Sequence, residues 1–161
     1  MPQKITIAVV GARELSPQEE QLAYSVGKII AGLGAVLVCG GLMGVMQAAA
    51  RGAKQAGGLT IGILPGIDKA DANPYIDVAI PTSIGFARNA IVACSADIIV
   101  ALPGSYGTSS EISYGLIYNR PVIDLGNWNV PGMIPVKDLT EVEAKLQTLI
   151  KEIERKREIV R

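Results

Sequence analysis

The stretch Leu102-Pro-Gly-Ser-Tyr-Gly-Thr-Ser-Ser-Glu111 decides how this chain folds. It follows the apolar run Asp97-Ile-Ile-Val-Ala-Leu102 and precedes a run that suits a helix, from Ile112 to Tyr118. We therefore expect a buried strand that leads through a glycine-rich turn into the first turn of a helix. The first amides of a helix have no intrahelical acceptor, and the helix dipole leaves partial positive charge there. The junction thus predicts a binding site for an anion.

Several residues within this stretch suit such a site. Gly104 and Gly107 allow the backbone to approach a ligand closely, because no Cβ stands in the way. Ser105 and Thr108 offer hydroxyls that can bind the same anion or cap the helix. Glu111 either complements the helix dipole or faces the pocket as a polar anchor or a general acid or base. A capped connection without any ligand is the alternative for this stretch.

The composition of the chain narrows the classes of function. Of its 161 residues 49% are apolar and 19% charged, and the formal net charge is zero. This balance gives no basic face for nucleic acid, and no apolar run approaches the roughly 20 residues of a membrane span. No signal peptide is visible before the first strand. We expect one cytoplasmic domain over residues 1–161 that binds neither nucleic acid nor membrane.

The chain contains no histidine. That absence excludes Ser-His-Asp and Cys-His nucleophile systems and every histidine-ligated zinc site. Cys39 and Cys94 lack ligand-like spacing and are expected to be small buried hydrophobic residues. No metal site is expected, and any catalysis would rest on carboxylates, hydroxyls, Lys, Arg, Tyr or backbone donors.

Runs that suit strands alternate with helical patterns along the whole chain. Strands are expected at 4–10, 35–39, 59–64, 75–80, 97–102 and 122–125. Helices are expected after the capping box Ser16-Pro-Gln-Glu19, at 45–56, from about 86 to 96, after the opening stretch and at 139–160, with a loop at 126–135. This alternation predicts an α/β fold, a doubly wound parallel sheet of about six or seven strands with helices on both faces.

Three glycine turns are expected at the carboxyl ends of strands, where ligands bind in such folds. They lie at Gly11, at Gly40-Gly41-Leu-Met-Gly44 and at Pro103-Gly104. We expect the three turns to line one cleft. Neither a P-loop motif nor a true G-x-G-x-x-G turn is present, so P-loop hydrolysis of nucleoside triphosphates and ordinary dinucleotide binding are both disfavoured.

Arg88 and Asn89 are the polar residues at the start of an otherwise apolar helix, just after another strand end. A buried arginine needs a partner, and a ligand phosphate or Glu111 would serve. The alternative is a pair between Arg88 and a carboxylate that only joins helices. Arg13, next to the first glycine turn, is a weaker candidate for the cleft.

The glycine turns, together with Phe86-Ala-Arg-Asn89, resemble a known superfamily. It contains the LONELY GUY-type cytokinin-activating phosphoribohydrolases and many chains labelled "possible lysine decarboxylase". Three further stretches are most similar to its molybdenum cofactor carrier protein branch: Gly57-Gly-Leu-Thr-Ile-Gly-Ile-Leu-Pro-Gly66, Asn73-Pro-Tyr-Ile-Asp77, and the run from Ala79 to Val92. The resemblance extends from the first strand to the sixth.

The carrier resemblance implies a Rossmann-like subunit of a homo-oligomer, a dimer or a tetramer, that binds the pterin-based molybdenum cofactor without chemistry on it and passes it to molybdoenzymes. The phosphate would lie at the helix start, and the glycine turns would let the ring system approach. The binding residues expected are Gly11, Gly40, Gly41, Gly44, Arg88, Asn89, Gly104, Ser105, Gly107, Thr108 and Glu111. No zinc and no catalytic residue belong to this hypothesis.

The enzyme hypothesis is a phosphoribohydrolase that cleaves a nucleoside 5′-monophosphate, with Arg88 and Glu111 as the catalytic pair. The chain departs from that pattern at Ser105, Asn89 and Ser110, which stand where the hydrolases have glycine, a basic residue and glutamate. A nucleotide-sensing binding protein is a third hypothesis. A pyridoxal phosphate decarboxylase is disfavoured, because none of the glycine turns carries a lysine for the Schiff base.

Overall fold

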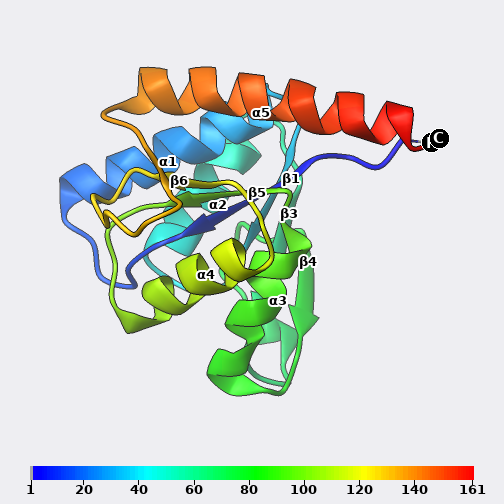
Figure 1. Cartoon of the computed structure of the whole chain (residues 1–161). Coiled ribbons are helices and arrows are strands. Elements are labelled where there is room, and N and C mark those ends of the chain that lie inside the picture. Colours follow the sequence, from blue (N-terminus) through cyan, green and yellow to red (C-terminus); the bar gives the residue numbers. More distant parts are fainter. Residues whose placement is uncertain (1) are drawn as a thin grey trace.

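The computed structural model describes residues 2–161 and is built on one parallel sheet (Figure 1). The strands of these residues are β1 (Thr6–Val10), β2 (Val36–Cys39), β3 (Thr60–Leu64), β4 (Val78–Pro81), β5 (Ile98–Ala101), β6 (Val122–Asp124) and β7 (Ile134–Pro135). They lie in the order β4-β3-β2-β1-β5-β6-β7, and every neighbouring pair is parallel. The predicted doubly wound α/β fold is confirmed, with the change of direction between β1 and β5.

Helices cover both faces of the sheet. They are α1 (Pro17–Gly32), α2 (Val45–Gln55), α3 (Arg88–Ser95), α4 (Tyr106–Ile117) and α5 (Leu139–Ile159), with short 3-10 turns η1 (Lys69–Asp71) and η2 (Gly85–Ala87). Helices α1, α2 and α5 pack on one face, and α3 and α4 on the other (Figure 1). Within the part of the chain that the structure describes, no helix is long and apolar enough to cross a membrane.

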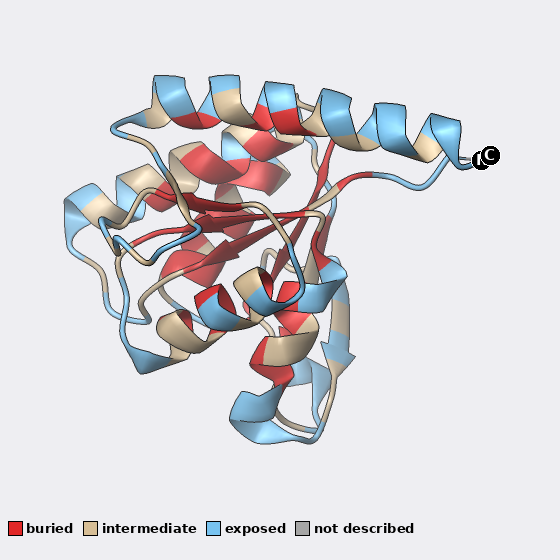
Figure 2. Ribbon diagram, viewed as in Figure 1, coloured by how far each residue is buried: buried red, intermediate tan, exposed pale blue. Residues whose placement is uncertain are grey.

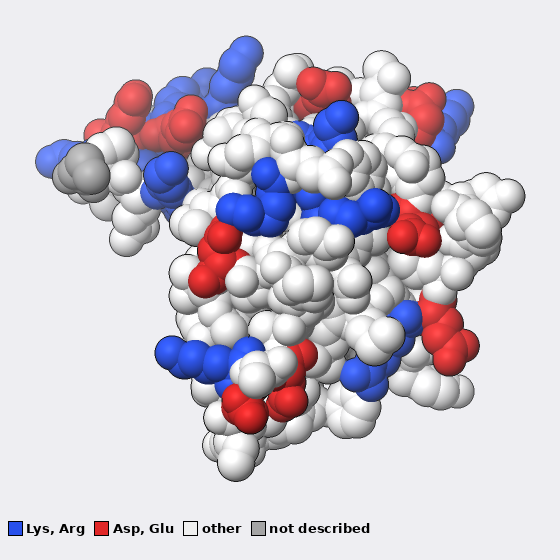
Figure 3. All heavy atoms as spheres, turned by 180° about the vertical axis from the view of Figure 1, so that it is seen from behind, with Lys and Arg blue, Asp and Glu red and all other residues white. Residues whose placement is uncertain are grey.

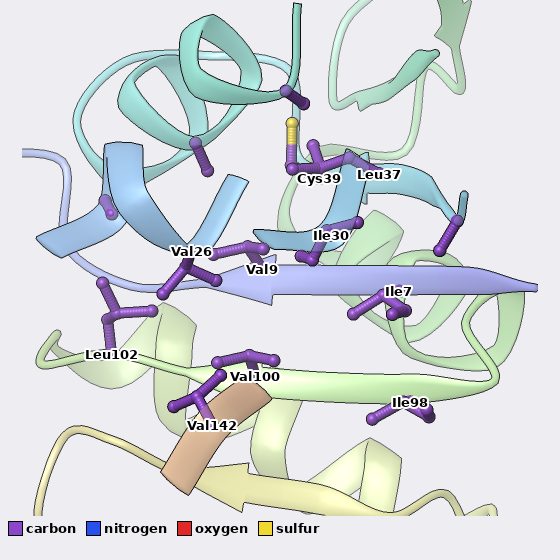
Figure 4. Close-up of a cluster of buried hydrophobic side chains, with 14 of the residues drawn as sticks. Ile7, Val9, Val26, Ile30, Leu37, Cys39, Ile98, Val100, Leu102 and Val142 are labelled. Atoms are coloured by element: carbon purple, nitrogen blue, oxygen red, sulfur yellow. The ribbon is translucent and has the colours of Figure 1, made fainter. Parts of the chain in front are cut away.

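The central strands are buried on both faces, as their apolar runs predict (Figure 2). Successive side chains of a strand point to opposite faces, so Ile7 and Val9 join the core under α1, α2 and α5, whereas Ala8 and Val10 join the core under α3 and α4. Figure 4 shows Val9 beside Val26 of α1 and Ile7 near Ile30 of the same helix. The sheet therefore presents its strand ends, rather than a face, to ligands.

The segments that differ from the sequence prediction have local causes. The fourth strand begins at Val78 rather than Tyr75, because the Tyr75 amide donates to Asn73 Oδ1 (3.1 Å) in a turn. The expected loop at 126–135 ends in the two-residue strand β7, which is too short to leave a sequence pattern. The capping box is confirmed, since Ser16 and Glu19 each accept the other's backbone N–H.

Two glycines let α1 and α2 pack with their backbones in contact. A Cβ on Gly27 would lie 1.9 Å from the Ala49 carbonyl oxygen, and a Cβ on Gly52 would lie 2.0 Å from the Tyr24 carbonyl oxygen. Neither position leaves room for a methyl group. This contact fixes α2, and with it the turn that precedes α2 at the strand ends.

We predict that Gly52→Ala lowers the free energy of unfolding by on the order of 2 kcal/mol, because the added methyl group forces the helices apart. Gly32→Ala is the matched control, since its Cβ meets nothing within 4 Å. At Gly32 the substitution should leave the free energy of unfolding unchanged or raise it by up to about 1 kcal/mol, because alanine reduces the conformational entropy of the unfolded chain. Urea unfolding of both variants measures the difference. Equal effects would contradict the close-contact explanation.

Candidate functional site

The turns that follow β1 to β5 surround a cavity of about 620 Å³ at the carboxyl ends of the strands. This is where ligands bind in doubly wound sheets. The cavity is lined by Gly11, Ala12, Arg13, Leu42, Met46, Pro65, Gly85, Phe86, Arg88, Asn89, Ser105, Tyr106, Gly107, Thr108, Ser110 and Glu111. Segments far apart in the sequence thus form one site.

Most of the residues expected to bind the ligand line this cavity. They are Gly11, Arg88, Asn89, Ser105, Gly107, Thr108 and Glu111. The other expected residues, Gly40, Gly41, Gly44 and Gly104, are not part of this lining. Gly40 and Gly41 are buried, Gly104 is exposed, and Gly44 lines a second hollow nearby.

Three of these glycines allow residues of the cavity lining to approach the backbone closely. A Cβ on Gly40 would lie 2.6 Å from Arg88 Nη2, and a Cβ on Gly104 would lie 2.1 Å from Thr108 Oγ1. Gly44 has a φ of 71°, and a Cβ there would lie 2.2 Å from the Ala12 carbonyl oxygen. The glycine turns thus allow the first turn, Arg88 and the start of α4 to come close together.

The start of α4 offers unpaired amides to the cavity. Ser105 is the N-cap residue, but its side chain makes no capping hydrogen bond. The first intrahelical bond runs from the Ser109 amide to the Ser105 carbonyl (2.9 Å), so the amides before Ser109 lack an intrahelical acceptor. At the start of α2, by contrast, the Val45 amide donates to the Ala12 carbonyl (2.9 Å). The first turn of α4 therefore has more amides free for a ligand than the Val45 position of α2.

Arg88 is buried, and its partners are uncharged. Nε donates to the Ile63 carbonyl (2.8 Å), Nη2 to the Gly40 carbonyl (3.3 Å), and Nη1 to Asn89 Oδ1. The alternative, a pair between Arg88 and a carboxylate, is not formed within residues 2–161, whose salt bridges do not include Arg88. Burial lowers the pKa of Arg88, and the nearby charge of Glu111 opposes that effect.

Glu111 is buried in the cavity wall, with 8% of its surface exposed. Its carboxyl group makes no hydrogen bond or ion pair to any residue that the structure describes. Burial raises the pKa of Glu111 to about 8, although the charge of Arg88 acts in the opposite direction. At neutral pH the group is therefore largely protonated, and its hydrogen-bonding capacity is available to a ligand.

The two departures from the hydrolase pattern at Asn89 and Ser110 are in contact with each other. Asn89 Nδ2 donates to Ser110 Oγ (3.0 Å) and to the Gly107 carbonyl (3.4 Å), and Ser110 Oγ donates to the same carbonyl (2.6 Å). A neutral hydrogen-bonded pair thus holds the first turn of α4 against α3. The side-chain amide of Asn89 therefore donates its hydrogen bonds within the protein.

The apolar residues of the lining were not predicted from the sequence. Phe86 and Tyr106 are 79% and 94% exposed. Leu42 and Pro65 line the cavity from the turns after β2 and β3, and Met46 lines it from the first turn of α2. The place of Leu42 and Pro65 just after strand ends was the available signal, since residues at the ends of parallel strands meet at one edge of the sheet.

The cysteines differ in their surroundings. Cys39 is buried as predicted, and burial raises its pKa to about 12. The prediction was wrong for Cys94, which is exposed near the end of α3. Among the described residues, no group of three or more His, Cys, Asp or Glu side chains is placed to hold a metal ion.

Comparison with known proteins gives one family model over nearly the whole chain. Residues 4–159 match the SLOG cluster4 family. An uncharacterized protein of Archaeoglobus fulgidus is 45% identical over 120 residues, which are 74% of this chain and 78% of that protein. The cytokinin riboside 5′-monophosphate phosphoribohydrolase of Mycobacterium tuberculosis is 32% identical over 117 residues, 67% of this chain and 63% of that enzyme.

Solved structures show the same fold over almost their full length. The molybdenum cofactor binding protein of Rippkaea orientalis has a TM-score of 0.83 and 35% identity, covering 94% of this chain and 98% of that one. The molybdenum cofactor carrier protein of Chlamydomonas reinhardtii has a TM-score of 0.84 and 31% identity, covering 92% and 99%. The resemblance stated from the sequence motifs is confirmed by these comparisons.

The raised pKa of Glu111 predicts an unusual dependence of stability on pH. A carboxyl that holds its proton more tightly when folded makes the protein less stable as pH rises from about 4.5 to about 8. Glu111→Gln cannot ionise, so the variant should match the wild type near pH 4.5 and exceed it above pH 8 by on the order of a few kcal/mol. Urea unfolding at a series of pH values measures this.

The control is Glu154→Gln on the exposed surface of α5. The free energy of unfolding of this variant should change with pH in parallel with that of the wild type. If the curves of Glu111→Gln and wild type were also parallel across this pH range, the buried neutral acid would be ruled out.

Proposed function

Because the chain belongs to the SLOG cluster4 family, we propose that it binds the molybdenum cofactor in the cavity at the strand ends and carries it without chemical change. The observation that carries this proposal is the pairing of two features in one cavity. The uncapped start of α4 suits a phosphate, and the buried, unpartnered Glu111 lies in the same wall. The likeness to molybdenum cofactor binding and carrier proteins supports the choice of ligand.

The residues present fit a phosphorylated pterin. The phosphate would accept hydrogen bonds from the first amides of α4 and from the hydroxyls of Ser105 and Thr108. Ser105 is exposed and its side chain makes no capping bond, so its hydroxyl can turn to the ligand without loss to the helix. Gly104 keeps Thr108 close beneath this turn. Gly107 lines the cavity beside them.

The rest of the cavity suits a flat heterocycle. Leu42, Met46 and Pro65 form apolar walls, and the exposed rings of Phe86 and Tyr106 lie at the lining. A pterin has a ring N–H beside an amino group, and both can donate to one carboxylate. Glu111 is the unpaired carboxyl that such an edge would satisfy. The cation Arg88 would stabilise the carboxylate formed there.

One observation favours a second function. A carboxyl with a pKa of about 8 beside an arginine is suited to general acid catalysis near neutral pH. The phosphoribohydrolase hypothesis therefore keeps Glu111 and Arg88 as its catalytic pair, with a nucleoside 5′-monophosphate as substrate. The neutral contact between Asn89 and Ser110 favours the carrier, because a hydrolase of this pattern has a basic residue and a carboxylate at those positions.

The test combines ligand identification with a variant that spares the fold. Small molecules released from freshly purified protein are identified by mass spectrometry, and the protein is titrated with molybdenum cofactor and with adenosine monophosphate. We expect recovered pterin, tight cofactor binding and no release of adenine. Adenine release that is lost in Glu111→Gln would instead establish the hydrolase.

For the phosphate site, Ser105→Ala should weaken cofactor binding by about 10-fold or more, the contribution of one hydrogen bond to a charged group. Its melting temperature should stay unchanged, because no capping bond is lost. Ser113→Ala, exposed on the same helix, should change neither quantity. Unchanged affinity in Ser105→Ala would remove this residue from the phosphate site.

We also propose that the carrier is a homo-oligomer that delivers the cofactor to molybdoenzymes. Apolar side chains stand exposed beside the cavity, among them Ile84 at 49% and Phe86 at 79%. Contact with another copy would cover them. Light scattering after size exclusion should give a dimer or a tetramer, and Phe86→Ser should shift the mass toward the monomer. A wild-type monomer at micromolar concentration would contradict this proposal.

A further inference from the structure

A second hollow of about 350 Å³ lies beside the main cavity, between the starts of α1 and α2. We call it the Arg13–Arg51 cleft, after the two guanidinium groups in its lining. Arg13 lines the main cavity as well, so the two spaces share one side chain. Figure 3 shows the rear face of the molecule, where Lys and Arg side chains gather across the middle. The cleft thus brings two positive charges to one concave place.

The guanidinium of Arg51 is held in place before any ligand arrives. It lies 4.8 Å from the centre of the Tyr24 ring, and its Nη2 lies 3.4 Å from Glu20 Oε1. About a third of its side chain is exposed. A guanidinium fixed on an aromatic face loses little freedom when it binds an oxyanion bidentately.

Other donors in the lining have no partner in the protein. The side chains of Arg13 and Gln47 and the hydroxyl of Tyr75 make no hydrogen bond or ion pair to residues 2–161. Gln47 lies in the first turn of α2, whose dipole favours negative charge. Together with Arg51 these groups supply donors from several directions, which suits a tetrahedral anion.

Glu20 is the acidic member of the lining. Its single contact with Arg51 is long, and more than half of its side chain is exposed. Such a surface pair contributes little stability, so a ligand with more charge can replace the carboxylate at little cost. Glu20 then acts as a competitor for Arg51, and its removal should favour an incoming anion.

We propose that the Arg13–Arg51 cleft is a second anion subsite that binds a phosphoryl group, next to the phosphate site at α4. The phosphoryl group is either a free anion or the far end of a ligand that extends from the main cavity past Arg13. The subsite rests on the proposed function only in the second case. In both cases Arg51 anchors the anion, and Arg13 links the two sites.

The first arm of the test uses inorganic pyrophosphate and isothermal titration calorimetry at low salt. Arg51→Gln should weaken its binding by about 10-fold or more, the effect of losing one charged donor. Glu20→Gln should tighten binding by about 2-fold or more, because the competing carboxylate is gone. The control is Lys151→Gln, which removes the same charge from the exposed surface of α5 outside the cleft lining.

The second arm compares adenosine monophosphate with a dinucleotide, NAD, to find the source of the phosphoryl group. A tethered phosphoryl group is indicated if Arg51→Gln weakens the binding of the dinucleotide and leaves the affinity for the monophosphate unchanged. A free anion is indicated if pyrophosphate still binds while the monophosphate saturates the main cavity. Either result supports the subsite.

The subsite is overturned if Arg51→Gln and Lys151→Gln weaken the binding of pyrophosphate equally, because the attraction is then a general charge effect. It is also overturned if pyrophosphate fails to bind the wild type. These outcomes leave cofactor binding in the main cavity untouched. Conversely, pyrophosphate binding that depends on Arg51 in a protein that fails to bind the molybdenum cofactor would keep the subsite and refute the proposed function. Melting temperatures of the variants confirm that each one is folded.

Discussion

The buried guanidinium of Arg88 is the interaction on which the shape of the cavity depends. It donates to the carbonyl of Ile63 in β3 and to the carbonyl of Gly40 just after β2. Through Asn89 the network continues to Ser110 in the second turn of α4. One side chain thus links two strand ends to two helices. Because a buried cation cannot leave its acceptors without a large cost, these four segments are held in one arrangement.

The same arrangement leaves positive charge at the site. Carbonyl groups satisfy the donors of Arg88 without cancelling its charge. Glu111, an acidic residue of the cavity lining, has a pKa raised to about 8 by burial and is largely neutral at physiological pH. The first amides of α4 and the side chain of Arg13 add to the positive charge at the cavity. The phosphate of the proposed ligand would compensate this charge.

The sequence predicts the fold well because the deciding signals are local. The capping box at Ser16 places α1, and the apolar runs place the central strands within two residues of their observed ends. The two-residue strand β7 leaves no comparable pattern. It pairs with β6, which lies at the edge of an already formed sheet, so its position depends on tertiary contacts.

The candidate site was predictable in part. The glycine turns indicated that some group approaches the backbone closely, but the sequence did not identify that group. Gly40 makes room for Arg88, and Gly44 makes room for the Ala12 carbonyl. These partners lie tens of residues away and come together only in the folded sheet. For the same reason the sequence indicated Arg13 only as a weaker candidate and did not point to Arg51, and only the structure brings the two into one cleft.

The contact between Asn89 and Ser110 links this geometry to the choice between binding and hydrolysis. The two residues are far apart in the sequence, and Asn89 Nδ2 lies 3.0 Å from Ser110 Oγ, so two of the three departures from the hydrolase pattern are in direct contact. A basic residue and a glutamate at these positions would also attract each other, so either pair can hold α3 against α4. The neutral pair keeps the contact but removes a carboxylate from the wall. Glu111 is then the acid left in the cavity lining, which is sufficient to orient a ligand but leaves bond cleavage without a second carboxylate.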